Sequence, residues 1–285
     1  MRWSSTIGRP RDSPKCTMTI ADTALGDGEV GEALLDGLDV YTVQAEHDEH
    51  PLSVYGINSE RACYSSETES LRPILLLHGR TWSSVPVFHL LGGSKQRRNE
   101  DESRSLMEAL CLTGLQPYTM DFRGFGGTPP DATHTVEPQK CVSDVETVLG
   151  WIADRHGLRS KTDNSEMPAL LGWSQGALVA QLVAQKNPTI LSKLILYGSI
   201  YDPLVRYPRE PLYTSSERDA PRIENTFDMA LEDFTIEGSI PPEPAMHFAE
   251  AALQSDPIKA VWSHLYQFNN CDPARVHVPT LVVSR

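Results

Sequence analysis

A short strand-to-helix turn around Ser174 is the feature that most constrains the fold of this chain. The stretch Gly172–Gly176, Gly-Trp-Ser-Gln-Gly, follows an apolar run at 169–171 and precedes an apolar helical pattern at 177–184. Glycines on both sides of the serine suit a turn so sharp that a side chain would collide with neighbouring backbone. The pattern therefore predicts a strand that passes directly into a helix, the repeating unit of sheets covered by helices.

The same turn has a chemical meaning. A Gly-x-Ser-x-Gly between a strand and a helix is typical of a nucleophile elbow, which exposes the serine hydroxyl at the end of the sheet. The backbone N–H of Gln175 would then lie at the helix N-terminus, where it can stabilise a developing oxyanion. Because glycine and serine are common, an ordinary glycine-bounded turn is the alternative, and the order of strand, turn and helix favours the elbow.

Composition limits the possible partners. The chain has 285 residues, a hydrophobic fraction of 40% and a net charge of −13, which are values of a soluble globular protein. Such an acidic chain is a poor partner for nucleic acid, because phosphate binding needs a basic surface. No apolar run approaches the roughly 20 residues that a membrane span needs.

The five cysteines are odd in number and scattered: Cys16, Cys63, Cys111, Cys141 and Cys271. No pair has the Cys-x-x-Cys spacing, so the sequence predicts neither a zinc site nor a disulfide framework. We therefore expect a reduced, cytoplasmic compartment, and no metal or organic cofactor.

Strands and helices alternate over residues 37–198. We expect strands at 39–44, 52–57, 74–77, 118–120, 169–171, 194–197 and 281–283, and helices at 106–110, 142–152 and 177–184. This order predicts an α/β fold with a mostly parallel sheet covered on both faces. Active sites on such sheets lie at the carboxyl ends of the strands, where the sequence places His78, Asp121, Ser174 and Gly198.

The remaining segments differ from this core. Residues 1–36 combine arginine with Ser, Thr and Pro and lack an apolar stretch, which predicts a disordered leader, with a weak organelle presequence or a mis-set start as alternatives. Residues 199–276 are rich in proline and aromatic residues, and two amphipathic helices at 227–234 and 245–268, the second interrupted at Pro257, predict a helical cap after the sixth strand. Residues 277–285 would begin the C-terminal core with a seventh strand.

Three motifs together resemble the α/β-hydrolase fold superfamily. They are His78-Gly79, Asp121-x-Arg123-Gly124-x-Gly126 and Gly172–Gly176, each directly after an expected strand. The similarity extends over residues 38–285 and is greatest to the capped serine-hydrolase branch, since the related epoxide hydrolases and haloalkane dehalogenases carry Asp at the elbow. It implies that Arg80, or Thr81 in a shifted loop, supplies a second oxyanion N–H, and that Arg123 shapes a structural turn.

The resemblance departs from the superfamily at the triad. The usual chain order is Ser, then acid, then His, and the sequence reaches Arg285 where the loop bearing the acid is expected to begin. We therefore expect either that the acid and base lie beyond Arg285 in a longer form or that the usual triad does not assemble. Within the chain, Asp202 is a candidate acid, although an Asp before Pro203 is also typical of a turn cap. The later histidines are weak candidates for the base: His247, His264 and His277.

These features predict a serine hydrolase that cleaves a small, apolar carboxylic ester or thioester through an acyl-enzyme on Ser174. A second interpretation is a catalytically inactive hydrolase fold that binds a small molecule or a partner, because a serine without a base is a poor nucleophile. A third is a carbon–carbon bond hydrolase or perhydrolase that uses the same serine. The sequence predicts neither the substrate nor the oligomeric state.

Overall fold

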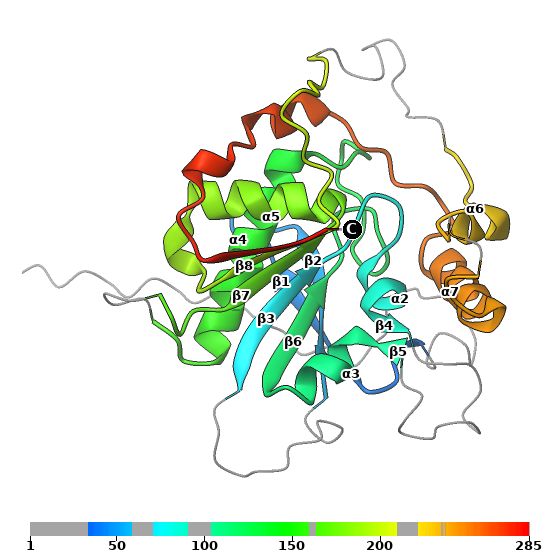
Figure 1. Cartoon of the computed structure of the whole chain (residues 1–285), viewed down its shortest axis with the longest axis horizontal. Coiled ribbons are helices and arrows are strands. Elements are labelled where there is room, and N and C mark those ends of the chain that lie inside the picture. The colour runs from blue at the N-terminus through cyan, green and yellow to red at the C-terminus, as the bar shows by residue number, and fades with distance from the viewer. Residues whose placement is uncertain are drawn as a thin grey trace, which may run out of the picture.

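The computed structural model describes residues 34–58, 71–90, 104–159, 164–209, 222–234, 236 and 238–284. Within them one sheet contains the strands β1 (Leu38–Gln44), β2 (Pro51–Ile57), β3 (Arg72–Leu77), β6 (Leu115–Met120), β7 (Ala169–Trp173), β8 (Leu194–Tyr197) and β9 (Thr280–Val283). The order across the sheet is β1-β2-β6-β3-β7-β8-β9 (Figure 1). Pairing is antiparallel for β1 with β2 and for β2 with β6, and parallel from β6 to β9. The predicted mostly parallel sheet is confirmed.

The α-helices of the described residues are α2 (Ser84–Phe88), α3 (Leu106–Cys111), α4 (Pro138–Arg155), α5 (Gln175–Lys186), α6 (Phe227–Leu231) and α7 (Pro242–Ser255). Short 3-10 helices follow at η2 (Pro188–Ile190), η3 (Leu265–Asn270) and η4 (Pro273–Arg275). Two short strands, β4 (His89–Leu90) and β5 (Arg104–Ser105), form an antiparallel ribbon. No helix in these ranges is both long enough and apolar enough to cross a bilayer.

Strand β3 shows how the sheet is covered on both faces. Successive side chains of a strand point to opposite faces, and the two alternating sets of β3 belong to different buried clusters. Leu75 and Leu77 pack in the cluster that contains α4 and α5 residues, whereas Ile74 and Leu76 pack with Phe88, next to α2 and α3 residues. All four β3 side chains are at most 2% exposed, so this strand is the centre of the core.

Helices α6 and α7 pack around a residue of the loop after β3. Trp82 is 1% exposed and forms a small apolar cluster with Phe248 and alanines of both helices. Figure 1 shows α6 and α7 beside α2, β4 and β5, at one side of the sheet. The helix expected at 245–268 begins earlier, at Pro242, and ends at Ser255, before the predicted interruption at Pro257.

The segments predicted from the sequence lie only partly within the described residues. Most of the expected leader, residues 1–33, lies outside the described residues. The limits 37–198 for the core, 199–276 for the cap and 277–285 for the last strand stay predictions. The three described cysteines, Cys111, Cys141 and Cys271, are buried free thiols.

Candidate active site

Ser174 lies at a strained turn between β7 and α5. Its backbone dihedrals are φ 54° and ψ −117°, a conformation that residues with a side chain rarely adopt. Two hydrogen bonds hold the turn: the Ser174 N–H donates to Tyr197 O at 3.0 Å, and the Ala177 N–H donates to Ser174 O at 3.1 Å. The strand, turn and helix that the sequence predicts are therefore present, with the serine at the apex.

The flanking glycines are required by close backbone approach. A Cβ added at Gly172 would lie 2.4 Å from the carbonyl oxygen of Gly176. A Cβ added at Gly176 would lie 2.3 Å from the carbonyl oxygen of His78, at the end of β3. The first turn of α5 can approach β3 this closely only because position 176 has no side chain.

The loop after β3 lies against the serine. A Cβ added at Gly79 would meet Ser174 Cβ at 3.3 Å and the Trp173 ring at 3.2 Å. The next residue, Arg80, carries the backbone N–H that the superfamily resemblance implies for the oxyanion. The loop is thus close to the serine turn at Gly79, and the role of Arg80 stays a prediction.

His78 orients the peptide that carries the Arg80 N–H. Its Nε2 accepts the Phe122 N–H at 3.0 Å, so the proton is on Nδ1, which donates to Gly79 O at 3.0 Å. Burial lowers the pKa of His78 to about 3, which keeps the ring neutral at physiological pH. These contacts use both ring nitrogens to hold the loop and assign His78 a structural role.

The two candidate oxyanion donors have no competing acceptor. In the described part of the chain, neither the Gln175 N–H nor the Arg80 N–H donates a hydrogen bond. Gln175 is also 1% exposed, and its side-chain Nε2 has no partner among those residues. Their part in holding an oxyanion stays a prediction.

The candidate acid lies in a surface turn. Asp202 is exposed, and its carboxylate accepts the Leu204 N–H at 2.8 Å while its carbonyl oxygen accepts the Val205 N–H at 3.2 Å. This is the turn-capping arrangement that the sequence offered as the other interpretation. Its role as a catalytic acid stays a prediction.

The late histidines contact other groups. His264 Nδ1 lies 3.5 Å from Glu137 Oε2, His247 Nδ1 lies 3.4 Å from an Arg104 guanidinium nitrogen, and His277 is exposed. Among the residues that the structure describes, no histidine and no carboxylate is hydrogen-bonded to Ser174 Oγ. The structure thus places Gln175 directly after Ser174 and Gly79 against it, whereas within the described ranges no hydrogen bond joins the later candidates to Ser174.

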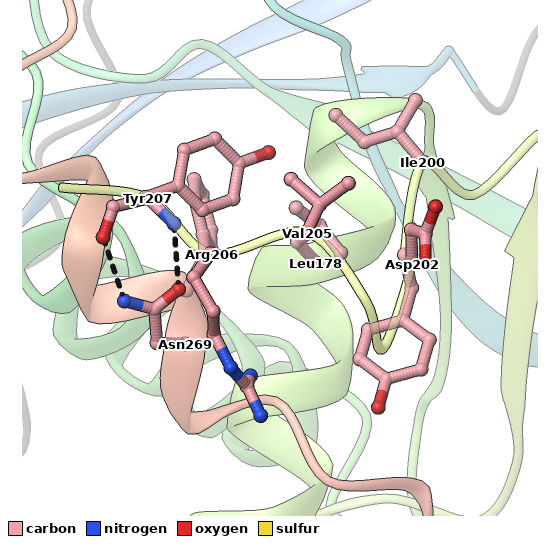
Figure 2. A pocket seen from close by; sticks show the side chains of 9 residues that line it. Leu178, Ile200, Asp202, Val205, Arg206, Tyr207 and Asn269 are labelled. Carbon is pink, nitrogen blue, oxygen red and sulfur yellow. Dashed lines mark hydrogen bonds between the residues drawn. The ribbon is translucent and has the colours of Figure 1, made fainter.

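A small pocket opens one helical turn beyond Ser174. Leu178 of α5 forms its floor, and the chain segment 200–207 and η3 form its sides (Figure 2). Asn269 of η3 fixes this segment, because its side chain both accepts the Tyr207 N–H and donates to Tyr207 O, each at 2.9 Å. The lining mixes apolar side chains with the charged Asp202 and Arg206.

Arg123 anchors the turn after β6 to α4. Its guanidinium, 2% exposed, donates to both carboxylate oxygens of Asp144 at 2.8 and 2.7 Å and to Asp48 at 3.0 and 2.5 Å. Asp144 is completely buried. Because these contacts occupy the guanidinium, Arg123 has the structural role that the resemblance implies.

Comparisons with known proteins agree with this architecture. The thioesterase domain from the curacin biosynthetic pathway has a similar structure, with a TM-score of 0.51 and 14% identity over 87% of this chain and 83% of that one. A membrane phospholipase A, a bacterial virulence factor, gives 0.46 and 15% over 89% and 71%. An epoxide hydrolase from an endophytic Streptomyces gives 0.40 and 18% over 59% and 39%. At such identities the first of these supports the fold and nothing finer.

The sequence comparison identifies the family. No protein of curated function matches the sequence. The model of a hydrolase family described as serine aminopeptidase, S33, matches residues 100–246, slightly more than half of the chain, and this range includes the serine turn. Together with the sheet order and the turn at Ser174, this match shows that the chain belongs to the serine aminopeptidase S33 family of α/β hydrolases.

Proposed function

We propose that this chain is a serine hydrolase that cleaves a carboxylic ester or thioester through an acyl-enzyme on Ser174. The observation that carries the proposal is the turn at Ser174, with its positive φ, its two glycines and its contact with the loop after β3. Such a turn costs backbone energy, on the order of 1–3 kcal/mol, and strain of this kind concentrates at functional sites. The membership in a hydrolase family supports the same assignment.

The proposed reaction has two halves. Ser174 Oγ attacks the carbonyl carbon and gives its proton to a base, while the carbonyl π electrons move to the oxygen, which accepts the Gln175 and Arg80 N–H groups. The tetrahedral intermediate then expels an alcohol or thiol, which takes the proton. Water attacks the acyl-enzyme in the same way and releases the acid and free Ser174. A general base is required for both halves. Since no histidine or carboxylate among the described residues is hydrogen-bonded to Ser174 Oγ, labelling of the serine also tests whether this chain supplies that base.

The pocket beside Leu178 supports a small, partly apolar substrate. It begins one turn of α5 after the serine and is bordered by Ile200 and Val205, which are exposed by 46% and 52%. Leu178 follows the serine by one turn of α5, and the apolar side chains that line the pocket with it suit an acyl chain or a leaving group. This pocket therefore supports esters or thioesters with a short apolar substituent.

Labelling with a fluorophosphonate tests the proposal. We expect one phosphonate adduct per chain by intact mass, no adduct in Ser174→Ala, and the wild-type rate in the control Ser143→Ala. Ser143 lies on α4, where its hydroxyl donates to Gln139 O within the helix. We expect labelling at Ser174 only, because a serine reacts at a useful rate when a base and an oxyanion hole activate it.

Absence of labelling at Ser174 would contradict the proposal. A folded wild-type sample without an adduct overturns the proposal and favours the inactive, binding interpretation. If labelling succeeds, a panel of p-nitrophenyl esters, acyl thioesters and a β-diketone separates ester or thioester cleavage from carbon–carbon bond cleavage. Turnover of the diketone alone would replace the proposed substrate class.

A further inference from the structure

Two arginines beside the candidate active site form no ion pair. Arg80 directly follows Gly79, whose added Cβ would meet Ser174 Cβ at 3.3 Å. Arg206 lines the pocket that begins at Leu178, one turn of α5 after the serine. Both arginine side chains are exposed, and within the described ranges neither guanidinium is hydrogen-bonded or paired with a carboxylate. As far as the structure describes the chain, both groups are therefore available to an anion.

The segment that carries Arg206 begins next to the serine. The Ser174 N–H donates at 3.0 Å to the carbonyl oxygen of Tyr197, the last residue of β8. Ile200 follows shortly after this strand and lines the pocket, and Arg206 lies further along the same segment. One wall of the pocket is therefore continuous with the strand that flanks the serine turn.

The backbone next to Arg206 is held by η3. The Asn269 side chain accepts the Tyr207 N–H and donates to Tyr207 O, each at 2.9 Å. The Tyr207 ring packs against the Phe268 ring, with the two centroids 6.0 Å apart. Phe268 and Asn269 also line the pocket. The guanidinium of Arg206 thus extends from a backbone that the opposite wall of the pocket fixes.

The charge of Arg80 acts on the same part of the molecule. Its carbonyl oxygen accepts the Trp262 Nε1–H at 3.0 Å, and the Trp262 ring packs against Phe268 with the centroids 6.2 Å apart. Burial raises the pKa of the Tyr207 phenol, and the positive charge of Arg80 opposes that shift. Two arginines from distant parts of the chain therefore place positive charge around this pocket.

The acidic side chain of the pocket lining does not neutralise Arg206. The Asp202 carboxylate accepts the Leu204 N–H at 2.8 Å, and no ion pair joins it to Arg206. Figure 2 shows the Asp202 carboxylate and the Arg206 guanidinium on opposite sides of Leu178, pointing away from each other. The pocket therefore has a cation on one side, an anion on the other and an apolar side chain between them.

This arrangement fits a carboxylate better than a phosphate. A guanidinium binds either group through paired N–H donors. A carboxylate carries one charge, whereas the charge of Asp202 on the other side disfavours the higher charge of a phosphate. The apolar side chains of Leu178, Ile200 and Val205 suit methylene groups. A short apolar chain that ends in a carboxylate matches both the apolar and the charged part of the lining.

We propose that the substrate is an ester or thioester whose short apolar acyl chain ends in a carboxylate, and that Arg206 recognises this carboxylate. This inference rests on the proposed function for the reaction, whereas recognition of the carboxylate does not depend on catalysis by Ser174. Arg80 adds positive charge that favours the same anion, in a chain whose net charge of −13 otherwise repels it.

A matched pair of ethyl esters tests the role of Arg206. Monoethyl glutarate and ethyl pentanoate have acyl chains with the same number of carbons and differ in the terminal group, a carboxylate or a methyl. We expect the ratio of kcat/KM for monoethyl glutarate to kcat/KM for ethyl pentanoate to fall about tenfold in Arg206→Gln, because a charge-assisted pair is lost. Taking the ratio removes differences in the fraction of folded enzyme.

Arg72→Gln is the matched control for this substitution. Arg72 is an exposed arginine at the first residue of β3, at the end of the strand opposite the His78 loop. Its loss changes the net charge by the same amount, so this variant should retain the wild-type ratio. Equal ratios in the wild type and in Arg206→Gln overturn the proposal.

Ionic strength provides a readout that needs no variant. Salt screens the attraction between exposed charges, so the wild-type ratio should fall several-fold between about 0.05 and about 0.5 M sodium chloride. The ratio for Arg206→Gln should change less over the same range. A wild-type ratio that does not respond to salt contradicts recognition by charge.

Binding without turnover separates this inference from the proposed function. In Ser174→Ala, titration followed by ligand-observed nuclear magnetic resonance should show that adding Arg206→Gln weakens the binding of monoethyl glutarate about tenfold. Equal affinities of the single and the double variant overturn the recognition by Arg206. A wild type that is neither labelled nor active on either ester overturns the proposed function and leaves the binding result valid.

Discussion

Gly176→Ala is expected to abolish fluorophosphonate labelling of Ser174 and to destabilise the fold. The new Cβ would lie 2.3 Å from His78 O and 2.7 Å from Leu77 O, and backbone atoms cannot rotate away as a side chain can. The first turn of α5 must therefore move from the end of β3, which separates the Gln175 N–H from the Arg80 loop. We expect a loss of about 3 kcal/mol of stability and on the order of 10²-fold or more in labelling rate.

The measurement combines chemical denaturation with labelling kinetics, and Gly150→Ala is its control. Gly150 lies inside α4, where an added Cβ would meet no atom within 4 Å. Alanine there should raise stability by about 0.5–1 kcal/mol, because glycine costs more backbone entropy in a helix. Wild-type labelling by Gly176→Ala would show that the serine does not need this close approach, and would remove the structural basis of the proposed site.

Asp144→Ala should reduce the free energy of unfolding by about 3–5 kcal/mol, because it leaves a buried guanidinium without its main partner. Arg123 is 2% exposed and forms two hydrogen bonds with Asp144, which is itself completely buried. Asp48 retains contact with the guanidinium, but its side chain is 39% exposed and cannot replace the buried carboxylate. Urea denaturation followed by circular dichroism measures the loss.

Glu146→Ala is the matched control on the same helix. Its carboxylate binds Lys186 at 2.6 Å near the surface, where the lysine side chain is 52% exposed. Exposed pairs contribute about 0–1 kcal/mol, so this variant should differ little from the wild type. Equal losses in the two variants would mean that burial does not set the strength of the Arg123–Asp144 pair.

Long periodic segments were predictable from the sequence, and their ends were less so. The strand at 194–197 has the predicted limits, because its apolar residues coincide with its pairing to β7. The elbow strand, expected at 169–171, continues to Trp173, which pairs with Tyr197. Pairing with a neighbour, which the local sequence does not specify, decides where such a strand ends.

The shortest helices and strands have no sequence pattern from which they could be predicted. Helix α2 and the ribbon of β4 and β5 were not predicted, since two to five residues are too few to show a helical or strand period. The loop between β3 and α2 was predicted to carry His78, Gly79 and Arg80, but not the contacts that fix it. Those contacts come from Trp262, Asp233 and Asp256, which no motif connects to the loop.

The sequence by itself determined the strand–turn–helix around Ser174 and the motifs at the ends of β3 and β6, because steric limits on glycine turns and side-chain periodicity act over a few neighbouring residues. Only the tertiary structure brings the Asp256 carboxyl group to the Ser83 N–H, 173 residues earlier in the chain, and the Trp262 indole to the Arg80 carbonyl oxygen. Contacts of that kind depend on how the whole sheet and its helices pack. Their free energy is shared among many distant side chains, so no local sequence pattern predicts these contacts.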